Sequence, residues 1–159
     1  MAGGRGRQNG GGARSDFPPQ TSTGYVVRDA NRAFQRLLER RLVPYGITRG
    51  QWYFLRVLWI EDGLSQRELS ARVGTMEPTT VVALRGMERA GLVRRVRSAE
   101  DKRRTEVWLT PRARRLKSKL LPIARKITEE AEFGLTRREI AAFLRIALHM
   151  TRNVDRIES

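Results

Sequence analysis

The chain has 159 residues, of which 32 are Lys or Arg and 17 are Asp or Glu, so its formal net charge is +15. The positive charges of such a chain repel one another in the compact state, which favours an anionic partner. Nucleic acid is the commonest partner of this kind, followed by an anionic membrane surface. A chain that is generally rich in Arg would have the same net charge without such a partner. Without cysteine and with His149 as the one histidine, disulfides, thiol chemistry and multi-histidine metal sites are excluded. We expect no metal and no cofactor.

Two further patterns concern location and the N-terminus. The sequence has no apolar run of membrane-spanning length and no signal-peptide pattern, which predicts a cytoplasmic protein without a membrane partner. Residues 1–23 are rich in glycine and poor in apolar side chains, so we expect a disordered basic tail. Arg5, Arg7 and Arg14 in this tail either touch phosphates non-specifically or are simply solvated.

The first predicted helices follow the tail. Apolar residues at three- and four-residue spacing predict a helix over residues 25–42, within an N-terminal dimerisation segment at 24–46. A capping box formed by Thr48 and Gln51 then opens a second helix, predicted over 49–61. In this second helix Trp52, Leu55, Leu58 and Trp59 are expected to face inward.

Two short helices and a hairpin are predicted next. The first short helix ends at a glycine and the second begins at a proline, which suits a first helical turn. The period then changes to two, which predicts strands at 92–97 and 105–109 joined by the charged link 98–104. The residues that mark these boundaries are, in chain order, Ser65 and Glu68 as a capping box, Gly74, Pro78 and Gly91.

Two long helices complete the predicted order. One is expected from Thr110 to about residue 132, with Pro122 bending it. A third capping box, Thr136 with Glu139, opens the last helix, which is expected to run to about residue 155. The fold class predicted is mainly α with a small β-hairpin wing: a winged helix-turn-helix lobe at 47–110 and a C-terminal dimerisation region at 111–159.

The second short helix is the predicted DNA reader. If Thr80, Leu84 and Met87 face the core, the opposite face carries residues that can contact bases and phosphates. The alternative is an ordinary helical hairpin with a solvated Arg face. The candidate DNA contacts are Ser65, Gln66, Thr75, Pro78, Thr79, Val82, Arg85, Arg89, Lys102, Arg103 and Arg104.

Three of these candidates lie at the hairpin tip. Long cations there can reach into a minor groove and meet its negative potential. Asp101 lies two residues before Arg103, where a bidentate pair would orient the guanidinium group. A charged tip is also what a solvated turn has, but its position directly after the candidate reading helix favours a wing.

Together these segments resemble the MarR (multiple antibiotic resistance regulator) family of bacterial winged-helix regulators. The resemblance lies in LSQRELSARV at 64–73, EPTT at 77–80, MERAGLV at 87–93 and EDKRRTEVWLTP at 100–111. It implies a dimer joined by the first and last two helices, with Arg103 in a minor groove and the helix after Pro78 in the major groove. Two departures are Val82, where many members have a polar or basic reader, and Ala113, where glycine is common.

The outer helices also argue for a dimer by themselves. Leu116, Leu120, Ile123 and Ile127 form one apolar stripe, and Ile140, Phe143, Leu144, Ala147 and Leu148 form another. Two-fold association would bury both stripes and place two reading helices about one DNA turn apart, roughly 34 Å. The alternative is that the stripes close a bundle within one chain.

The function predicted is a homodimeric repressor of a pseudo-palindromic operator that a small aromatic or anionic ligand releases. The resemblance implies a ligand cleft, for which the candidate residues are Tyr45, Trp52, Tyr53, Arg49 and Arg56. The alternative is a ligand-independent architectural DNA-binding or protein-interaction module. An enzyme is disfavoured because no nucleophile–base pair, phosphate loop or carboxylate cluster occurs. The operator, the effector and the choice between repression and activation are not fixed by the sequence.

Overall fold

A computed structural model describes residues 18–99, 101 and 104–158. The chain divides into two units, residues 1–35 and 36–159. In the first unit, a short 3-10 turn (Pro19–Thr21) precedes the beginning of α1 (Thr23–Leu42). The apolar side chains of this part of α1, among them Tyr25 and Phe34, are exposed. The predicted helix at 25–42 is therefore confirmed.

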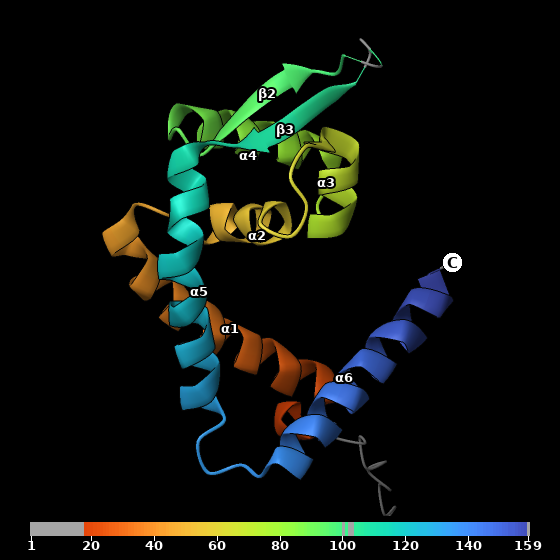
Figure 1. The fold of residues 1–159 in the computed structure, drawn as a ribbon. Coiled ribbons are helices and arrows are strands. Elements are labelled where there is room, and N and C mark those ends of the chain that lie inside the picture. Colours follow the sequence, from red (N-terminus) through yellow and green to blue (C-terminus); the bar gives the residue numbers. More distant parts are fainter. Residues whose placement is uncertain (1–17, 100, 102–103, 159) are drawn as a thin grey trace, which may run out of the picture. The chain divides into compact units, whose positions relative to one another are not determined.

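The second unit contains the predicted winged helix-turn-helix, and the fold class is confirmed (Figure 1). Its elements after α1 are η2 (Val43–Tyr45), α2 (Arg49–Leu58), β1 (Leu64–Ser65), α3 (Gln66–Val73), α4 (Glu77–Arg89), β2 (Val93–Arg97), β3 (Thr105–Leu109), α5 (Pro111–Ala131) and α6 (Arg137–Glu158). None of the helices in the described part of the chain is long and apolar enough to cross a membrane.

The helices begin where their capping residues predict. The capping boxes of Thr48 with Gln51 and Ser65 with Glu68 are both formed. The third, at the start of α6, is also formed, since the Thr136 N–H donates to Glu139 at 2.7 Å and the Glu139 N–H donates back to the threonine hydroxyl. These bonds satisfy amide groups that a helix start leaves without partners.

The end of α2 differs from the prediction. The helix was expected to reach residue 61 but ends at Leu58. The N–H groups of Ile60 and Glu61 both donate to the carbonyl of Val57, so the chain tightens into a turn before Gly63. Periodicity did not reveal this end because Trp59, beyond the helix, is still buried.

The sheet has three strands in the order β1–β3–β2, all antiparallel. The predicted two-stranded hairpin is correct for β2 and β3, but β1 was missed. It is two residues long, with Leu64 opposite Val107, and a strand this short shows no alternation in the sequence. Its effect is to fasten the base of the wing to the start of α3, because Ser65 is also the N-cap of α3.

The core of the lobe lies between α2, α3, α4, the sheet and the start of α5. Thr80, Leu84 and Met87 have no exposed surface, which confirms the predicted inward face of α4. The inward face predicted for α2 is confirmed too, and Trp52 meets Trp59 edge to face with ring centroids 5.8 Å apart.

The two long helices α5 and α6 differ in how far their apolar residues are buried. α5 begins at the Thr110 cap and continues through Pro122. The buried Leu120 joins the lobe's core, so part of the α5 stripe packs within the chain. By contrast, Phe143, Leu144 and Leu148 of α6 are 61%, 53% and 60% exposed.

Candidate nucleic-acid interface

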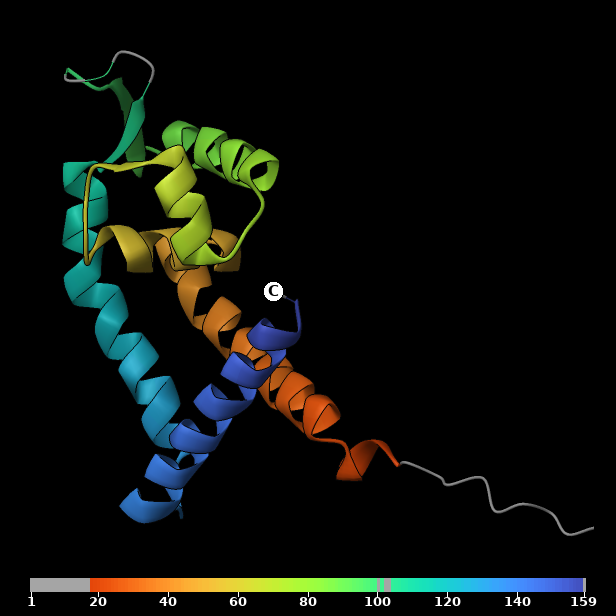
Figure 2. The same ribbon diagram turned by 90° about the vertical axis from the view of Figure 1, so that its right-hand side faces the viewer.

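The packing of the inward face of α4 determines which of its residues point outward. Leu84 is fully buried, whereas Val82, on the opposite side, is 67% exposed. Thr79, Arg85 and Arg89 are exposed as well, so the four predicted reader residues of α4 all face away from the core. Figure 2 shows α3 and α4 joined by their short turn, with the β2–β3 strands beside the two helices.

The two ends of α4 differ in their hydrogen bonds. No side chain caps the N-terminus, where Pro78 lies in the first turn, so the first amide groups remain available to an anion. At the C-terminus the Gly91 N–H donates to the main-chain carbonyl of Glu88, and the Leu92 N–H donates to that of Met87. This pair of bonds is a Schellman motif. The Arg112 guanidinium also donates to the Ala90 carbonyl there.

One strand of the wing is tied to α4 by an arginine. The Arg95 side chain donates to Glu88 with Nε at 2.8 Å and Nη2 at 2.6 Å, and the Arg95 N–H donates to the same carboxylate at 3.1 Å. These bonds from Arg95 lower the pKa of Glu88 below its ordinary value. Oε1 of a third residue, Gln66, lies 3.5 Å from Arg95 Nη1.

The other strand of the wing is tied to α3. Nη2 of Arg104, the residue just before β3, lies 2.8 Å from Oε2 of Glu68. The same oxygen accepts the N–H and hydroxyl of Ser65, and these bonds, with the charge of Arg104, lower the pKa of Glu68. In this structure Arg104 therefore forms an ion pair with a carboxylate of its own chain, although it was predicted as a DNA contact.

The remaining predicted wing residues have different outcomes. Lys102 and Arg103 lie outside the described residues. Asp101 is exposed, and its carbonyl accepts the Arg104 N–H at 2.8 Å. Its predicted role in orienting Arg103 stays a prediction.

Two further predicted contacts serve the helix-turn-helix itself. The Ser65 hydroxyl caps α3, and the Thr75 hydroxyl lies 2.9 Å from that of the buried Thr80. Several predicted residues nevertheless lie together around one open hollow of about 500 Å³ between the helix starts and the wing. Its lining residues are Ser65, Gln66, Arg67, Glu77, Asp101, Arg104 and Thr105.

Sequence reasoning missed three residues that build this interface. Arg95 and Glu88 join β2 to α4, and Asp62 joins the end of α2 to the sheet and to α5. The Asp62 carboxylate accepts the N–H of Leu109 at 2.8 Å and pairs with Arg114 at 2.8 Å. None of these pairs could be found from local spacing, because each joins residues of different elements.

The predicted ligand residues are divided by burial. Trp52 is 5% exposed and belongs to the core, and the Arg56 guanidinium lies 5.5 Å from its ring centroid. Tyr53, Arg49 and Arg56 are exposed, and Tyr45 is half-buried against the core. Their role in ligand binding stays a prediction.

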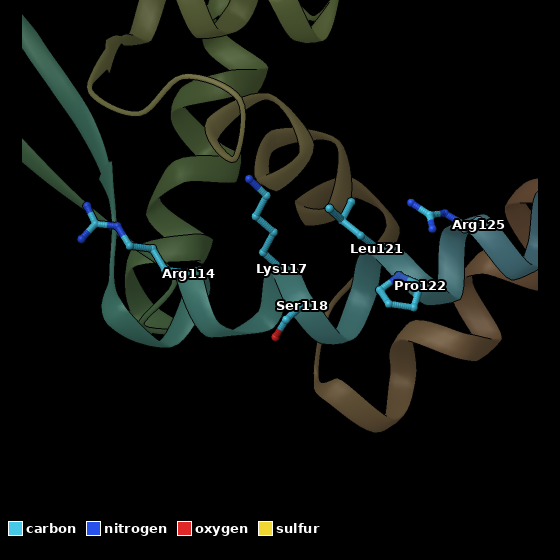
Figure 3. Close-up of a pocket in the computed structure, with 6 residues that line it drawn as sticks. All are labelled: Arg114, Lys117, Ser118, Leu121, Pro122 and Arg125. Atoms are coloured by element: carbon cyan, nitrogen blue, oxygen red, sulfur yellow. The ribbon is translucent and has the colours of Figure 1, made fainter.

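A second open hollow, of about 440 Å³, runs along α5 (Figure 3). Two of its cations have partners in the chain, since Lys117 donates to the Trp59 carbonyl at 2.9 Å and Arg114 pairs with Asp62. These bonds fasten α5 to the end of α2. The lining residues are Arg114, Lys117, Ser118, Leu121, Pro122 and Arg125.

A helix pair with an exposed second helix, followed by a two-stranded wing tied to both helices, defines a winged helix-turn-helix protein. The model of the MarR family matches residues 45–104. The HTH-type transcriptional regulator TtmR of Methylorubrum extorquens (strain PA1) is 35% identical over 96 residues, which are 60% of this chain and 49% of that regulator. The match thus spans about half the length of that relative.

Solved structures extend the similarity over most of the chain. A MarR transcriptional regulator from Methanosarcina mazei Go1 is 30% identical with a TM-score of 0.74, covering 82% of this chain and 96% of that one. The S. aureus MepR–DNA complex has a TM-score of 0.78 at 23% identity, covering 83% and 98%, and shares the fold. The chain belongs to the MarR family and is a MarR-type transcriptional regulator.

Proposed function

We propose that this protein is a sequence-specific regulator that binds double-stranded DNA as a homodimer, acts as a repressor, and is released by a small aromatic or anionic ligand. The observation that carries DNA binding is the outward face of α4, where Thr79, Val82, Arg85 and Arg89 are exposed beside a basic wing. In this proposal the regulator binds chromosomal DNA in the cytoplasm.

In this proposal α4 enters the major groove and the wing follows the neighbouring minor groove. Arg85 and Arg89 are long enough to address guanine edges or phosphates, and the exposed methyls of Val82 fit a thymine methyl. The uncapped first turn at Pro78 offers amide groups to a phosphate. The S. aureus MepR structure, which shares the fold, is a complex with DNA, and this supports DNA binding by the proposed regulator.

The homodimer is supported by the apolar face of α6. Phe143, Leu144 and Leu148 are all more than half exposed in the single chain, and a second copy would remove them from water. An interface related by two-fold symmetry buries the same stripe on both copies. It would present two α4 helices to a pseudo-palindromic operator with half-sites about 34 Å apart.

The proposed effector site lies on the exposed face of α2. The exposed Tyr53, Arg49 and Arg56 lie along one helix and combine an aromatic ring with cations, which suits an aromatic anion. A thermal-shift screen with aromatic acids and their thioesters tests this. We expect a concentration-dependent rise in Tm that Arg56→Ala reduces; a stabilising ligand unaffected by changes at all three positions would place the effector site elsewhere.

DNA binding is tested on a duplex of about 30 base pairs, selected by the wild-type chain from a randomised pool. Replacing Arg103 or Arg85 by Ala should each weaken binding by about 1–3 kcal/mol if the arginine addresses a base edge. Lys126→Ala, on the exposed surface of α5, is the matched control and should leave affinity unchanged. Unchanged affinity and salt dependence for both arginine variants would contradict the assignment of α4 and the wing.

Dimerisation is tested separately by sedimentation. Leu144→Glu should convert the dimer to a monomer, because the two-fold interface would then bury two unpaired carboxylates, one from each copy. Deleting residues 1–23 should leave the dimer intact. A monomeric wild type at micromolar concentration would refute the homodimer without affecting the assignment of the reading helix.

A further inference from the structure

We propose that Arg95 and Arg104 are positioning residues, which tie the two strands of the wing to Glu88 of α4 and Glu68 of α3, so that the wing and the reading helix meet DNA as one rigid body. This inference rests on the proposed DNA-binding function. It reassigns Arg104, which the sequence predicted as a direct DNA contact.

The outer part of the wing needs such support because its sheet is narrow there, whereas Val93, Val107 and Leu109 anchor the base of the wing in the core. The third strand is two residues long and pairs only with Glu106 and Val107 of β3. Beyond that point the wing is a two-stranded ribbon, and isolated two-stranded ribbons are marginally stable in water. Arg95, opposite Val107, lies within this support near its outer end, and Arg104, immediately before β3, lies beyond it.

The tether from β2 is the tighter of the two. Arg95 uses its main-chain N–H, Nε and Nη2 on one carboxylate, at 3.1, 2.8 and 2.6 Å. The two side chains are 27% and 31% exposed, which makes this pair less exposed than most of the ion pairs among the described residues. A multidentate contact fixes direction as well as distance, so β2 is oriented relative to the helix that carries the exposed Val82 and Arg85.

The tether from β3 ends on a carboxylate that is itself held in place. Glu68 accepts the N–H and the hydroxyl of Ser65 at 2.8 and 2.7 Å, and the same oxygen receives Arg104. The main chain of Arg104 is fixed too, through its N–H bond to the Asp101 carbonyl. The arginine is thus held at both its main chain and its side chain.

Both glutamates place negative charge on a surface that is proposed to face phosphates, and only Glu68 has a second role, in the capping box of α3. A carboxylate near DNA is repelled by the phosphate backbone and should weaken binding. Glu68 and Glu88 would offset this cost if they pre-order the wing, because ordering that is complete before binding does not oppose it. Glu77 provides the contrast: it lines the same hollow as Arg104, but its ion pair with Arg67 is long, at 4.0 Å, and both side chains are highly exposed.

The test compares Glu68→Gln with Glu77→Gln in the full chain, using fluorescence anisotropy on the duplex selected by the wild type. Gln still serves at the third position of a capping box, so α3 keeps its start while the charge is lost. We expect Glu68→Gln and Arg104→Ala each to weaken binding about two- to fivefold, with an unchanged salt slope. The variant that combines Glu68→Gln with Arg104→Ala should bind the duplex no more weakly than the weaker-binding of the two single variants. Glu77→Gln should bind more tightly than wild type.

Other results would overturn the proposal. If Glu68→Gln tightens binding as Glu77→Gln does, or leaves it unchanged, the carboxylate has no positioning role. If Arg104→Ala lowers the salt slope by about one, the arginine touches a phosphate directly. Glu88→Gln gives an independent measurement on the other tether and should have the same sign as Glu68→Gln. A failure of the proposed function would look different, because the wild-type chain itself would retain no duplex.

Discussion

The winged lobe and α6 use the same kind of residue with opposite results. Leu84 of α4 has no exposed surface, whereas Leu148 of α6 is 60% exposed. Both helices carry apolar residues at helical spacing, and both begin and end as their sequences predict within a few residues. The difference is that α2, α3 and the sheet cover the inward face of α4, while the apolar face of α6 lies open in the single chain.

This difference shows that the apolar face of a helix predicts a surface that covers it, but does not identify the element or chain that provides that surface. In the lobe the partner surface comes from the same chain and fixes the direction of the outward face of α4. For α6 we propose that it comes from a second copy. The lobe should therefore respond to substitutions through folding stability, and α6 through self-association.

The largest expected effect tests this contrast directly. Leu84→Ala leaves a cavity in the core and should reduce the free energy of unfolding by about 2–5 kcal/mol. Leu148→Ala removes a similar side chain from an exposed face and should weaken self-association instead. Urea unfolding and sedimentation velocity measure the two quantities. Equal losses of unfolding free energy in both variants at high dilution, where the chain is monomeric, would show that the α6 face is covered within one chain.

A close contact inside the lobe gives the next largest effect. Gly63 has φ +77°, and a Cβ atom there would lie 2.5 Å from Cζ2 of Trp108. Gly63→Ala should cost about 2–4 kcal/mol, from left-handed backbone strain together with overpacking. Gly74, with φ +72° and open space around it, is the control, and Gly74→Ala should cost only the backbone part. Thermal unfolding of both variants checks the order; similar losses would mean that the ring moves aside freely.

A smaller effect of opposite sign is expected on the outward face of α4. Gly86 lies inside the helix, and an added Cβ would meet nothing within 4 Å. Gly86→Ala should therefore raise the free energy of unfolding by about 0.5–1 kcal/mol. The same methyl group would face the major groove and should weaken binding to the selected duplex. A variant that is stabilised and binds as tightly as wild type would show that this part of α4 does not approach DNA closely.

The smallest effect is a pH dependence that distinguishes the lobe from α6. The pKa of Glu88 is lowered by Arg95, so its stabilising contribution is present above its ordinary value of 4.5 and is lost as the pH falls through the lower pKa of the folded state. Glu88→Gln should flatten the acid side of the stability profile of the lobe. The pKa of Glu139, at the start of α6, is lowered by Thr136, and Glu139→Gln should leave the unfolding of the lobe unchanged. Trp fluorescence, which reports the lobe, measures both profiles from neutral pH to below pH 4.5.

Much of the fold could be predicted because its signals are local. Capping boxes such as Thr48 with Gln51, the glycine stop at Gly74 and the proline start at Pro78 involve neighbours in the chain. The period of the apolar residues then gave the inward face of α4, and with it the outward set that includes Val82 and Arg85. These features depend on propensity and spacing, which the sequence contains in full.

The tertiary structure decided which of the candidate residues remain available. Ser65, Thr75 and Arg104 are polar or charged and lie in the predicted interface, but their side chains bind other parts of the chain. No spacing rule predicts that, since Arg104 and Glu68 are 36 residues apart and Arg95 meets Glu88 only because β2 folds back along α4. Hydrogen bonds act over about 3 Å, so the partner of an arginine is set by what the fold brings to its tip. The sequence by itself determined the helix-turn-helix, its wing and the outward face of α4; only the folded chain determined which arginines pair with carboxylates beside that face.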